Sequence, residues 1–195
     1  PIPRRQRQMC IRDSYKTPKI HWDRNMARGK PFYYYSYGAA VSEVLIDTLT
    51  GEYEIKRVDI LHDVGKSLNK TIDMGQIEGG FIQGMGWLTC EELFWGPDGA
   101  LKTHAPSTYK IPLASDRPDI FNIKIASWSR NLEKTIKRSK AVGEPPFMLA
   151  ISVHEAIQMA VASVSDYKIN PRLNAPATPE EVLSSIHNIQ RITQV

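Results

Sequence analysis

A helical hydrophobic repeat interrupted by glycines is the feature that most constrains this fold. In the segment Thr71–Trp95, apolar side chains recur at α-helical spacing, at Ile77, Phe81, Met85 and Leu88. The same segment contains Gly75, Gly79, Gly80, Gly84 and Gly86. Each interior glycine costs a helix up to about 1 kcal/mol relative to alanine, so this many together need a structural or functional reason.

Glycines at this density allow either another backbone or a flat ligand to approach the helix closely. Their order matches neither a phosphate-binding loop nor the dinucleotide fingerprint. On a helix, Gln76, Gly80 and Gln83 share one side, which is bare except for two amides. Such a face suits a planar heterocycle with mixed donors and acceptors, or an oxo group on a metal centre. Close helix packing, with Gln83 solvated, is the favoured alternative.

The segments around this helix predict a mixed α+β fold. Residues 15–30 are polar and predict irregular structure. The aromatic and β-branched stretch Phe32–Asp47 predicts a strand, and a turn at 48–51 leads into a return strand over 52–65, which together form a hairpin. Apolar and polar residues alternate in Ile120–Trp128, which predicts another strand.

Two helices are predicted in the last third of the chain. One follows Pro145 and Pro146 and continues to about Ser163. The other occupies residues 177–190, where Thr178 and Glu181 have the spacing of a capping box.

The composition is that of a globular protein. The chain has 195 residues, of which 42% are hydrophobic and 24% charged, and this length predicts one domain or slightly more. The most apolar stretch, Phe147–Val164, is interrupted by His154 and Glu155, so we expect no membrane span. We also expect no secretory leader.

Residues 1–14 predict a non-native or disordered leader that does not belong to the fold. They carry four arginines and one aspartate, which is +3 of the net charge of +4. The stretch MCIRDS resembles translated sequencing-adaptor DNA, and a natural basic tail is the alternative. Because the rest of the chain is nearly neutral, we expect no nucleic-acid surface. The predicted domain therefore occupies residues 15–195.

The remaining ionisable groups do not form a metal-ligand set. The chain has only Cys10 and Cys90, which excludes a disulfide framework and a cysteine cluster and favours a cytoplasmic setting. His62, Asp63 and His104 have no partners at ligand spacing, so we expect them to make structural hydrogen bonds.

Glu144 lies between a glycine and two prolines at the start of a predicted helix. Pro145 is expected to force Glu144 into an extended conformation at about the N-cap position. An immobile carboxylate near the positive end of a helix is a candidate general base. A plain capping acid, or a glutamate in a surface salt bridge, is the alternative.

Several motifs resemble the C-terminal part of the molybdenum-binding subunit of bacterial xanthine dehydrogenase, a molybdenum hydroxylase. They are DMGQIEGGFIQGMGWLTCEEL, THAPSTYKIP, SKAVGEPPF, YKTPKIHWDR, LHDVGKSLN and the final APATPEEVL. The resemblance extends from about Tyr15 to the C-terminus.

The resemblance implies an enzyme that oxidises hypoxanthine and xanthine to urate with water as the oxygen source. Its cofactor is a molybdenum atom held by molybdopterin. In that family the glutamate of VGEPP, here Glu144, is the base that takes the proton from the molybdenum-bound hydroxide. Gln76 corresponds to a glutamine that hydrogen-bonds at the molybdenum centre, and Lys140 to a lysine that lines the substrate pocket.

The family's remaining cofactor-binding and substrate-orienting residues lie upstream and are not in this chain, so we expect an incomplete catalytic subunit. FAD and [2Fe-2S] clusters are then expected on a partner chain, in a hetero-oligomer without membrane or nucleic acid. Two alternatives stay open: a non-catalytic interaction domain that keeps the fold, and a related hydroxylase of aldehydes or other N-heterocycles.

Overall fold

The computed structural model describes residues 16–193 and divides the chain into two compact units, Pro1–Tyr35 and Ser36–Val195. The described part of the first unit contains a small antiparallel hairpin of β1 (His21–Asp23) and β2 (Arg28–Lys30). The Asp23 carboxylate closes the turn by accepting hydrogen bonds from the backbone N–H groups of Asn25, at 2.9 Å, and Met26, at 3.2 Å. The prediction of irregular structure was therefore wrong for these residues. The predicted leader, 1–14, lies outside the described residues.

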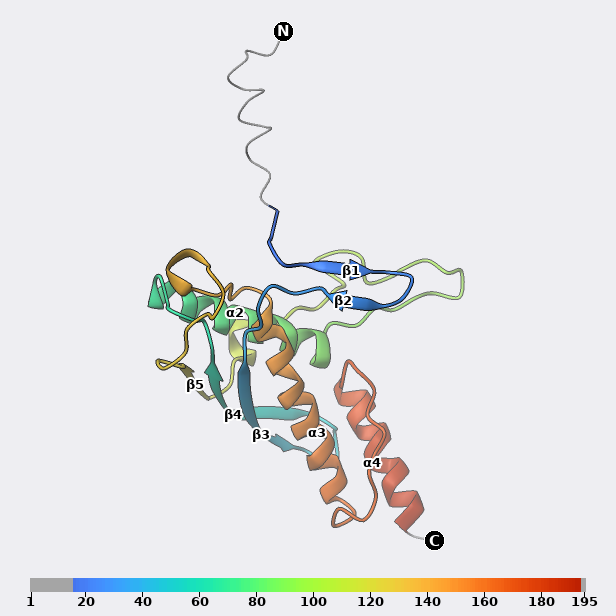
Figure 1. Ribbon diagram of the computed structural model, residues 1–195. Helices are drawn as coiled ribbons and strands as arrows, with labels where there is room; N and C mark the ends of the chain where they lie inside the picture. Colours follow the sequence, from blue (N-terminus) through green and yellow to red (C-terminus); the bar gives the residue numbers. More distant parts are fainter. Residues whose placement is uncertain (1–15, 194–195) are drawn as a thin grey trace. The chain divides into compact units, whose positions relative to one another are not determined.

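The second unit contains a three-stranded mixed sheet, in the order β3-β4-β5 (Figure 1). Strands β3 (Gly38–Ile46) and β4 (Tyr53–His62) form the predicted antiparallel hairpin, although β3 begins at Gly38 instead of Phe32. Strand β5 (Ile120–Ile125) pairs with β4 in parallel and ends before the predicted Trp128. The expected α+β class is confirmed.

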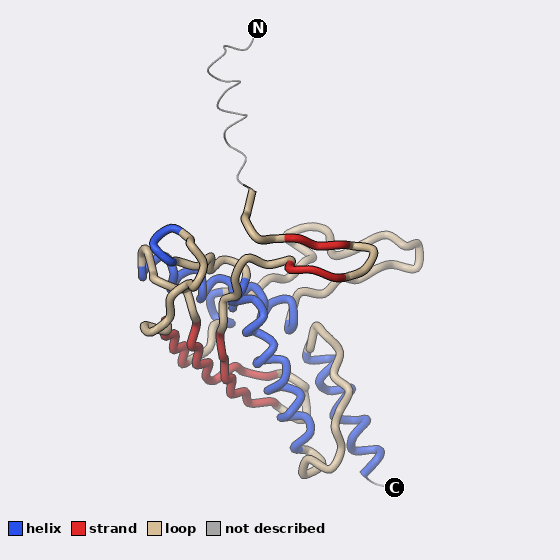
Figure 2. The backbone as a smooth tube through the Cα atoms, in the orientation of Figure 1, coloured by secondary structure: helices blue, strands red, loops and turns tan. Residues whose placement is uncertain are grey.

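Three α-helices and three 3₁₀ turns complete this unit (Figure 2). They are α2 (Lys70–Thr89), η1 (Ala114–Asp116), η2 (Ile136–Arg138), η3 (Pro145–Ala150), α3 (Ile151–Ser163) and α4 (Pro179–Thr193). Helix α2 ends six residues before the predicted Trp95. The backbone N–H groups of Cys90 and Glu91 both bond to the Gly86 carbonyl, at 3.0 and 2.9 Å, and this terminates the helix.

Helices α2 and α3 pack on the same face of the sheet. Val58 and Ile60 of β4 form one buried cluster with Phe81 of α2 and Ile157 of α3. The rings of Phe81 and Phe121, on β5, have centroids 5.5 Å apart. Full burial of side chains of this size contributes about 1.5–3 kcal/mol each, so this layer holds α2 in place.

The continuous helical run Pro145–Ser163 has the length and apolar composition of a membrane-spanning helix. Within it, however, Val153, Ile157 and Val161 are fully buried in the domain. Helix α3 also contacts β3 along the sheet. A core helix of a folded domain meets the same test of length and composition. About 33% of the most apolar window of this run is buried inside the protein.

The predicted capping box before α4 is half formed. The Thr178 hydroxyl accepts a hydrogen bond from the Glu181 backbone N–H at 3.3 Å, as expected. The Glu181 carboxylate does not reach back to the cap. It accepts instead from the backbone and side-chain N–H groups of Asn174, both at 2.9 Å, and so holds the preceding loop against the helix.

Candidate functional site

The glycines of α2 lie on two different sides of the helix. On one side, a Cβ added to Gly80 would lie 3.1 Å from the Gly143 carbonyl oxygen, and one added to Gly84 would lie 2.5 Å from the Phe147 carbonyl oxygen. Asn69 is the N-cap residue of α2, and its side chain accepts hydrogen bonds from the backbone N–H groups of Thr71 and Ile72. The close-packing explanation is therefore confirmed for Gly80 and Gly84, which allow the 143–150 segment to lie directly against the helix.

On the other side, Gly75 and Gly79 face open space. A Cβ added to either would meet no atom within 4 Å. Both line a cavity of about 670 Å³, together with Glu78, Ile82, Gln83, Glu91, Ile111, Pro112, Arg117 and Phe121. Packing does not explain these two glycines, so the flat-ligand explanation remains for this side of the helix.

Gln76 is exposed and lies beside the segment that carries Glu144. Its Oε1 atom is 3.6 Å from the point where a Cβ on Gly143 would stand. Because Gly143 directly precedes Glu144, the helix and the VGEPP segment meet at these residues. The two candidate residues that are 68 positions apart in the chain are thus brought together by the contact of α2 with η3.

Glu144 occupies the N-cap position of η3, as predicted, but its backbone is helical (φ −89°, ψ −35°) and not extended. The physical reason is the 3₁₀ turn, because the Glu144 carbonyl accepts the Phe147 N–H at 3.0 Å. The side chain makes no capping hydrogen bond. Pro145 and Pro146 have no N–H to offer, and the next one is already bonded, so the exposed carboxylate is not used by the helix.

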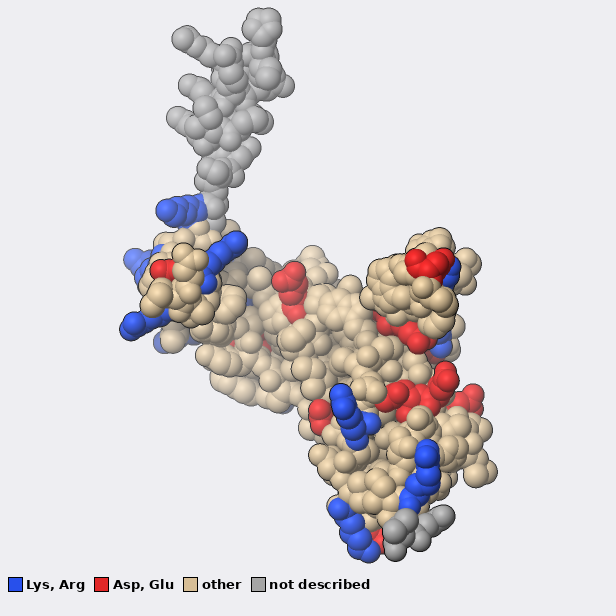
Figure 3. Space-filling view, turned by 90° about the vertical axis from the view of Figure 1, so that its right-hand side faces the viewer, with Lys and Arg blue, Asp and Glu red and all other residues tan. Residues whose placement is uncertain are grey.

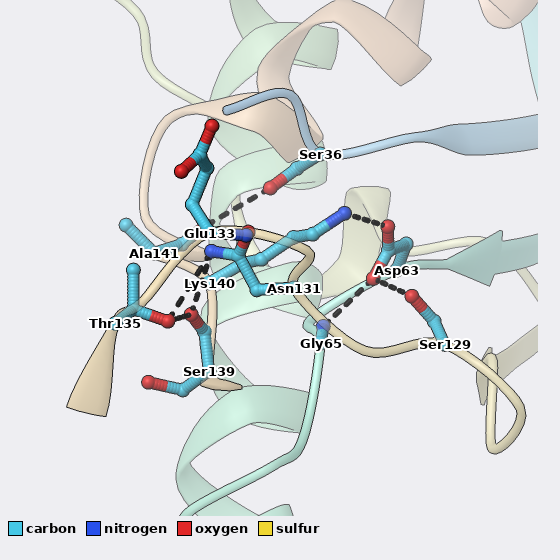
Figure 4. Close-up of polar contacts among 10 residues, drawn as sticks. All are labelled: Ser36, Asp63, Gly65, Ser129, Asn131, Glu133, Thr135, Ser139, Lys140 and Ala141. Atoms are coloured by element: carbon cyan, nitrogen blue, oxygen red, sulfur yellow. Dashed lines mark hydrogen bonds and ion pairs between the residues drawn. The ribbon is translucent and has the colours of Figure 1, made fainter. Parts of the chain in front are cut away.

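Lys140 forms a buried ion pair with Asp63, which lies just after β4 (Figure 4). The side chains are only 7% and 9% exposed. Asp63 also accepts hydrogen bonds from the Ser129 hydroxyl and from the Gly65 backbone N–H, the latter at 2.7 Å. Burial raises the pKa of Asp63, but the hydrogen bonds from Lys140, Ser129 and Gly65 outweigh it and lower the pKa below its usual value of 3.8.

The neighbouring His62 is 1% exposed, and its Nδ1 has no hydrogen-bond partner among the described residues. Burial lowers the pKa of His62 below its usual 6.5, although the adjacent Asp63 opposes this. A neutral imidazole is therefore favoured in the folded protein.

Structural hydrogen bonding, the expectation for Asp63, is confirmed. The pairing of Asp63 with Lys140 is absent from the sequence pattern, since 77 positions separate them.

On the face shown in Figure 3, acidic side chains lie among the basic ones near α4, and the basic side chains form no single patch there. Within residues 16–193, no group of three or more His, Cys, Asp or Glu side chains is placed to hold a metal ion.

Residues 4–118 match the model of a family described as molybdopterin cofactor-binding domain. The chain is 48% identical over 174 residues to a xanthine dehydrogenase/oxidase of Felis catus, and 46% identical over 179 residues to a xanthine dehydrogenase of Oryza sativa subsp. japonica. Each alignment covers 86% of this chain but 13% of the relative. The chain therefore spans a small part of the length of these proteins.

A solved structure agrees with this relationship. The aldehyde oxidoreductase from Desulfovibrio gigas aligns with 86% of this chain and 17% of its own, with a TM-score of 0.67 and 31% sequence identity. The fold described above thus recurs within a much longer chain.

Proposed function

The chain belongs to the molybdopterin cofactor-binding domain family, and from that premise we propose that it supplies the base and an orienting amide of a xanthine dehydrogenase-type hydroxylase. The observation that carries the proposal is the position of the Gln76 amide beside Gly143, next to Glu144. Because Glu144 follows Gly143 directly, the amide and the carboxylate extend from neighbouring positions at the contact of α2 with η3, from which both would act on the same bound group.

The residues present fit a flat, ring-containing cofactor. Gly75 and Gly79 leave the side of α2 open at the cavity, where alanine side chains would project into it. Gln83 and Arg117 offer hydrogen-bond donors in the same cavity. When bound, molybdopterin would supply the metal centre that accepts electrons from the substrate.

Glu144 would accept the proton in the proposed reaction, and Gln76 would orient the group that gives it up. The Glu144 carboxylate is exposed and forms no ion pair within residues 16–193, so it is available to accept a proton from a group bound beside it. The Gln76 amide both donates and accepts hydrogen bonds and would orient that group. Packing of Pro146 and Phe147 against Gly80 fixes the backbone that carries the base.

The substrate class proposed is a purine such as hypoxanthine or xanthine. The identity to xanthine dehydrogenases is 46–48% over most of the chain, against 31% to the aldehyde oxidoreductase. This difference favours a purine over an aldehyde. With two cysteines, this chain cannot ligate a [2Fe-2S] cluster with four thiolates, so the clusters and FAD are assigned to other parts of a cytoplasmic assembly.

The test is Glu144→Gln in the full-length protein. We expect the variant to keep molybdenum and pterin, measured by metal and pterin analysis, and to lose about 10²–10⁴-fold in kcat, the usual contribution of a general base. Glu155→Gln, an exposed position on α3, is the matched control and should leave kcat unchanged. Unchanged turnover in Glu144→Gln would remove the base assignment.

A further inference from the structure

The buried Asp63–Lys140 pair is not explained by stability alone. Both side chains have lost nearly all contact with water, with 9% and 7% exposure. Removing two charges from water costs several kcal/mol per ion, and a buried pair often contributes no more than apolar side chains of the same volume. The surrounding hydrogen bonds from Ser129 and Gly65 satisfy the carboxylate but tie it to one geometry.

The backbone around Lys140 is tied to the same place. The Lys140 N–H bonds to the Val64 carbonyl at 2.9 Å, and Gly65 forms an isolated antiparallel bridge with Ser139. Gly65 has φ +61°, and a Cβ there would lie 2.5 Å from the Arg138 carbonyl oxygen, so only glycine fits this contact. The end of β4 and the start of the VGEPP segment are therefore joined by main chain and side chain together.

From this anchor, the chain is fixed again on both sides of Glu144. Val142 is buried at 6% exposure, and Pro146 is buried beneath Gly80 of α2. Glu144 is exposed and lies between these two buried positions. Its location is thus set by one anchor four residues upstream and another two residues downstream.

We propose that Asp63 and Lys140 are a positioning pair, which fixes the VGEPP segment so that Glu144 is held beside Gln76. This rests on the proposed function, since it gives the pair a role through the base. The ammonium of Lys140 faces Asp63 and the Tyr37 ring, whose centroid is 5.3 Å away, and acts on the backbone that follows it. Lys140 then affects turnover through Glu144 and not by binding the substrate.

The experiment replaces the whole pair with apolar side chains, Asp63→Leu with Lys140→Met, in the full-length protein. This avoids a single buried charge, which would threaten folding. Because a displacement of about 1 Å can reduce a rate about 10²-fold, we expect kcat to fall 10- to 100-fold with KM within about twofold. The matched control is Lys56→Met with Asp119→Leu, which removes an exposed pair at the sheet, 40% and 65% exposed. It should leave both constants unchanged.

A second readout needs no turnover. In cofactor-free protein, the amides of residue 140 and Phe147, whose N–H groups bond to the Val64 and Glu144 carbonyls, should exchange at least tenfold faster in the apolar double variant, while α4 exchanges as in the wild type. A raised KM with unchanged kcat would overturn the proposal and assign Lys140 to the substrate pocket. Unchanged kcat and unchanged exchange would also overturn it. Glu144→Gln separates this proposal from the proposed function. If Glu144→Gln loses turnover, the base assignment holds even when the positioning role of the pair is overturned. If Glu144→Gln keeps full turnover, the proposed function itself fails.

Discussion

Gly84→Ala is the substitution for which the structure gives the sharpest expectation. An alanine Cβ at this position would stand 2.5 Å from the Phe147 carbonyl oxygen and 3.1 Å from the Ala150 side chain. The nearest atom belongs to backbone, which cannot rotate away as a flexible side chain can. Helix α2 and η3 must therefore separate, or one of them must bend.

The size of the effect follows from two opposing terms. Replacing a helical glycine with alanine stabilises the helix by about 0.5–1 kcal/mol. Overpacking a filled contact costs typically about 1–3 kcal/mol, and a backbone collision places Gly84 in the upper part of that range. We expect a net destabilisation of about 1–2 kcal/mol. Gly79→Ala is the matched control, because its Cβ would meet no atom within 4 Å. Gly79→Ala should therefore show only the stabilisation of about 0.5–1 kcal/mol that alanine gives a helix relative to glycine.

Amide hydrogen exchange of α2 and of residues 147–150 measures this difference locally, in the cofactor-free full-length protein, so that the cavity beside Gly79 is empty in both variants. The two alanine variants should differ by about 2–3 kcal/mol, which corresponds to exchange about 30- to 150-fold faster in Gly84→Ala. Equal exchange in both variants would show that the two elements do not pack as closely as described, and the explanation of this glycine would then be wrong.

Two further predictions concern stability. Because burial lowers the pKa of His62, the unfolded chain binds a proton more readily than the folded one, so the free energy of unfolding should fall as pH decreases from about 6.5 towards the lowered pKa. Urea unfolding at a series of pH values should show this fall in the wild type, and His62→Gln should flatten it; an unchanged slope would contradict a buried neutral imidazole. Thr178→Ala should lower thermal stability by about 1 kcal/mol through loss of the cap on α4, whereas Thr193→Ala at its other end should not. Equal losses in both would argue against the cap.

The parts of the fold that could be predicted from the sequence are those encoded by local patterns. Strand β5 follows from alternation and helix α2 from helical spacing of apolar residues, whereas the β3–β4 hairpin follows from β-branched and aromatic residues around a turn and the final helix from its capping box. The small β1–β2 hairpin was missed because its strands are three residues long, which is too short to show an alternation of apolar and polar residues.

The candidate site was predictable in part. The contact between Gln76 and the VGEPP segment fits a bare helix face beside a turn fixed by prolines. Which glycines of α2 are packed and which face open space could not be predicted, because this depends on which element covers each side of the helix. The helical backbone of Glu144 was missed because a residue before proline usually adopts an extended conformation. Here the 3₁₀ hydrogen bond from the Phe147 N–H to the Glu144 carbonyl outweighs that preference. The Asp63–Lys140 pair depends on tertiary structure alone.

The mixed order of the sheet implies a sequence of folding events. Strands β3 and β4 are joined by a short turn, Asp47–Glu52, so their pairing closes a small loop. Strand β5 is parallel to β4 and separated from it by residues 63–119, which include α2. Closing this longer loop costs more chain entropy and is slower. We expect nascent chains to form the hairpin first and to add β5 only after α2 has condensed onto it, which leaves one edge of β4 transiently open to pairing with other chains.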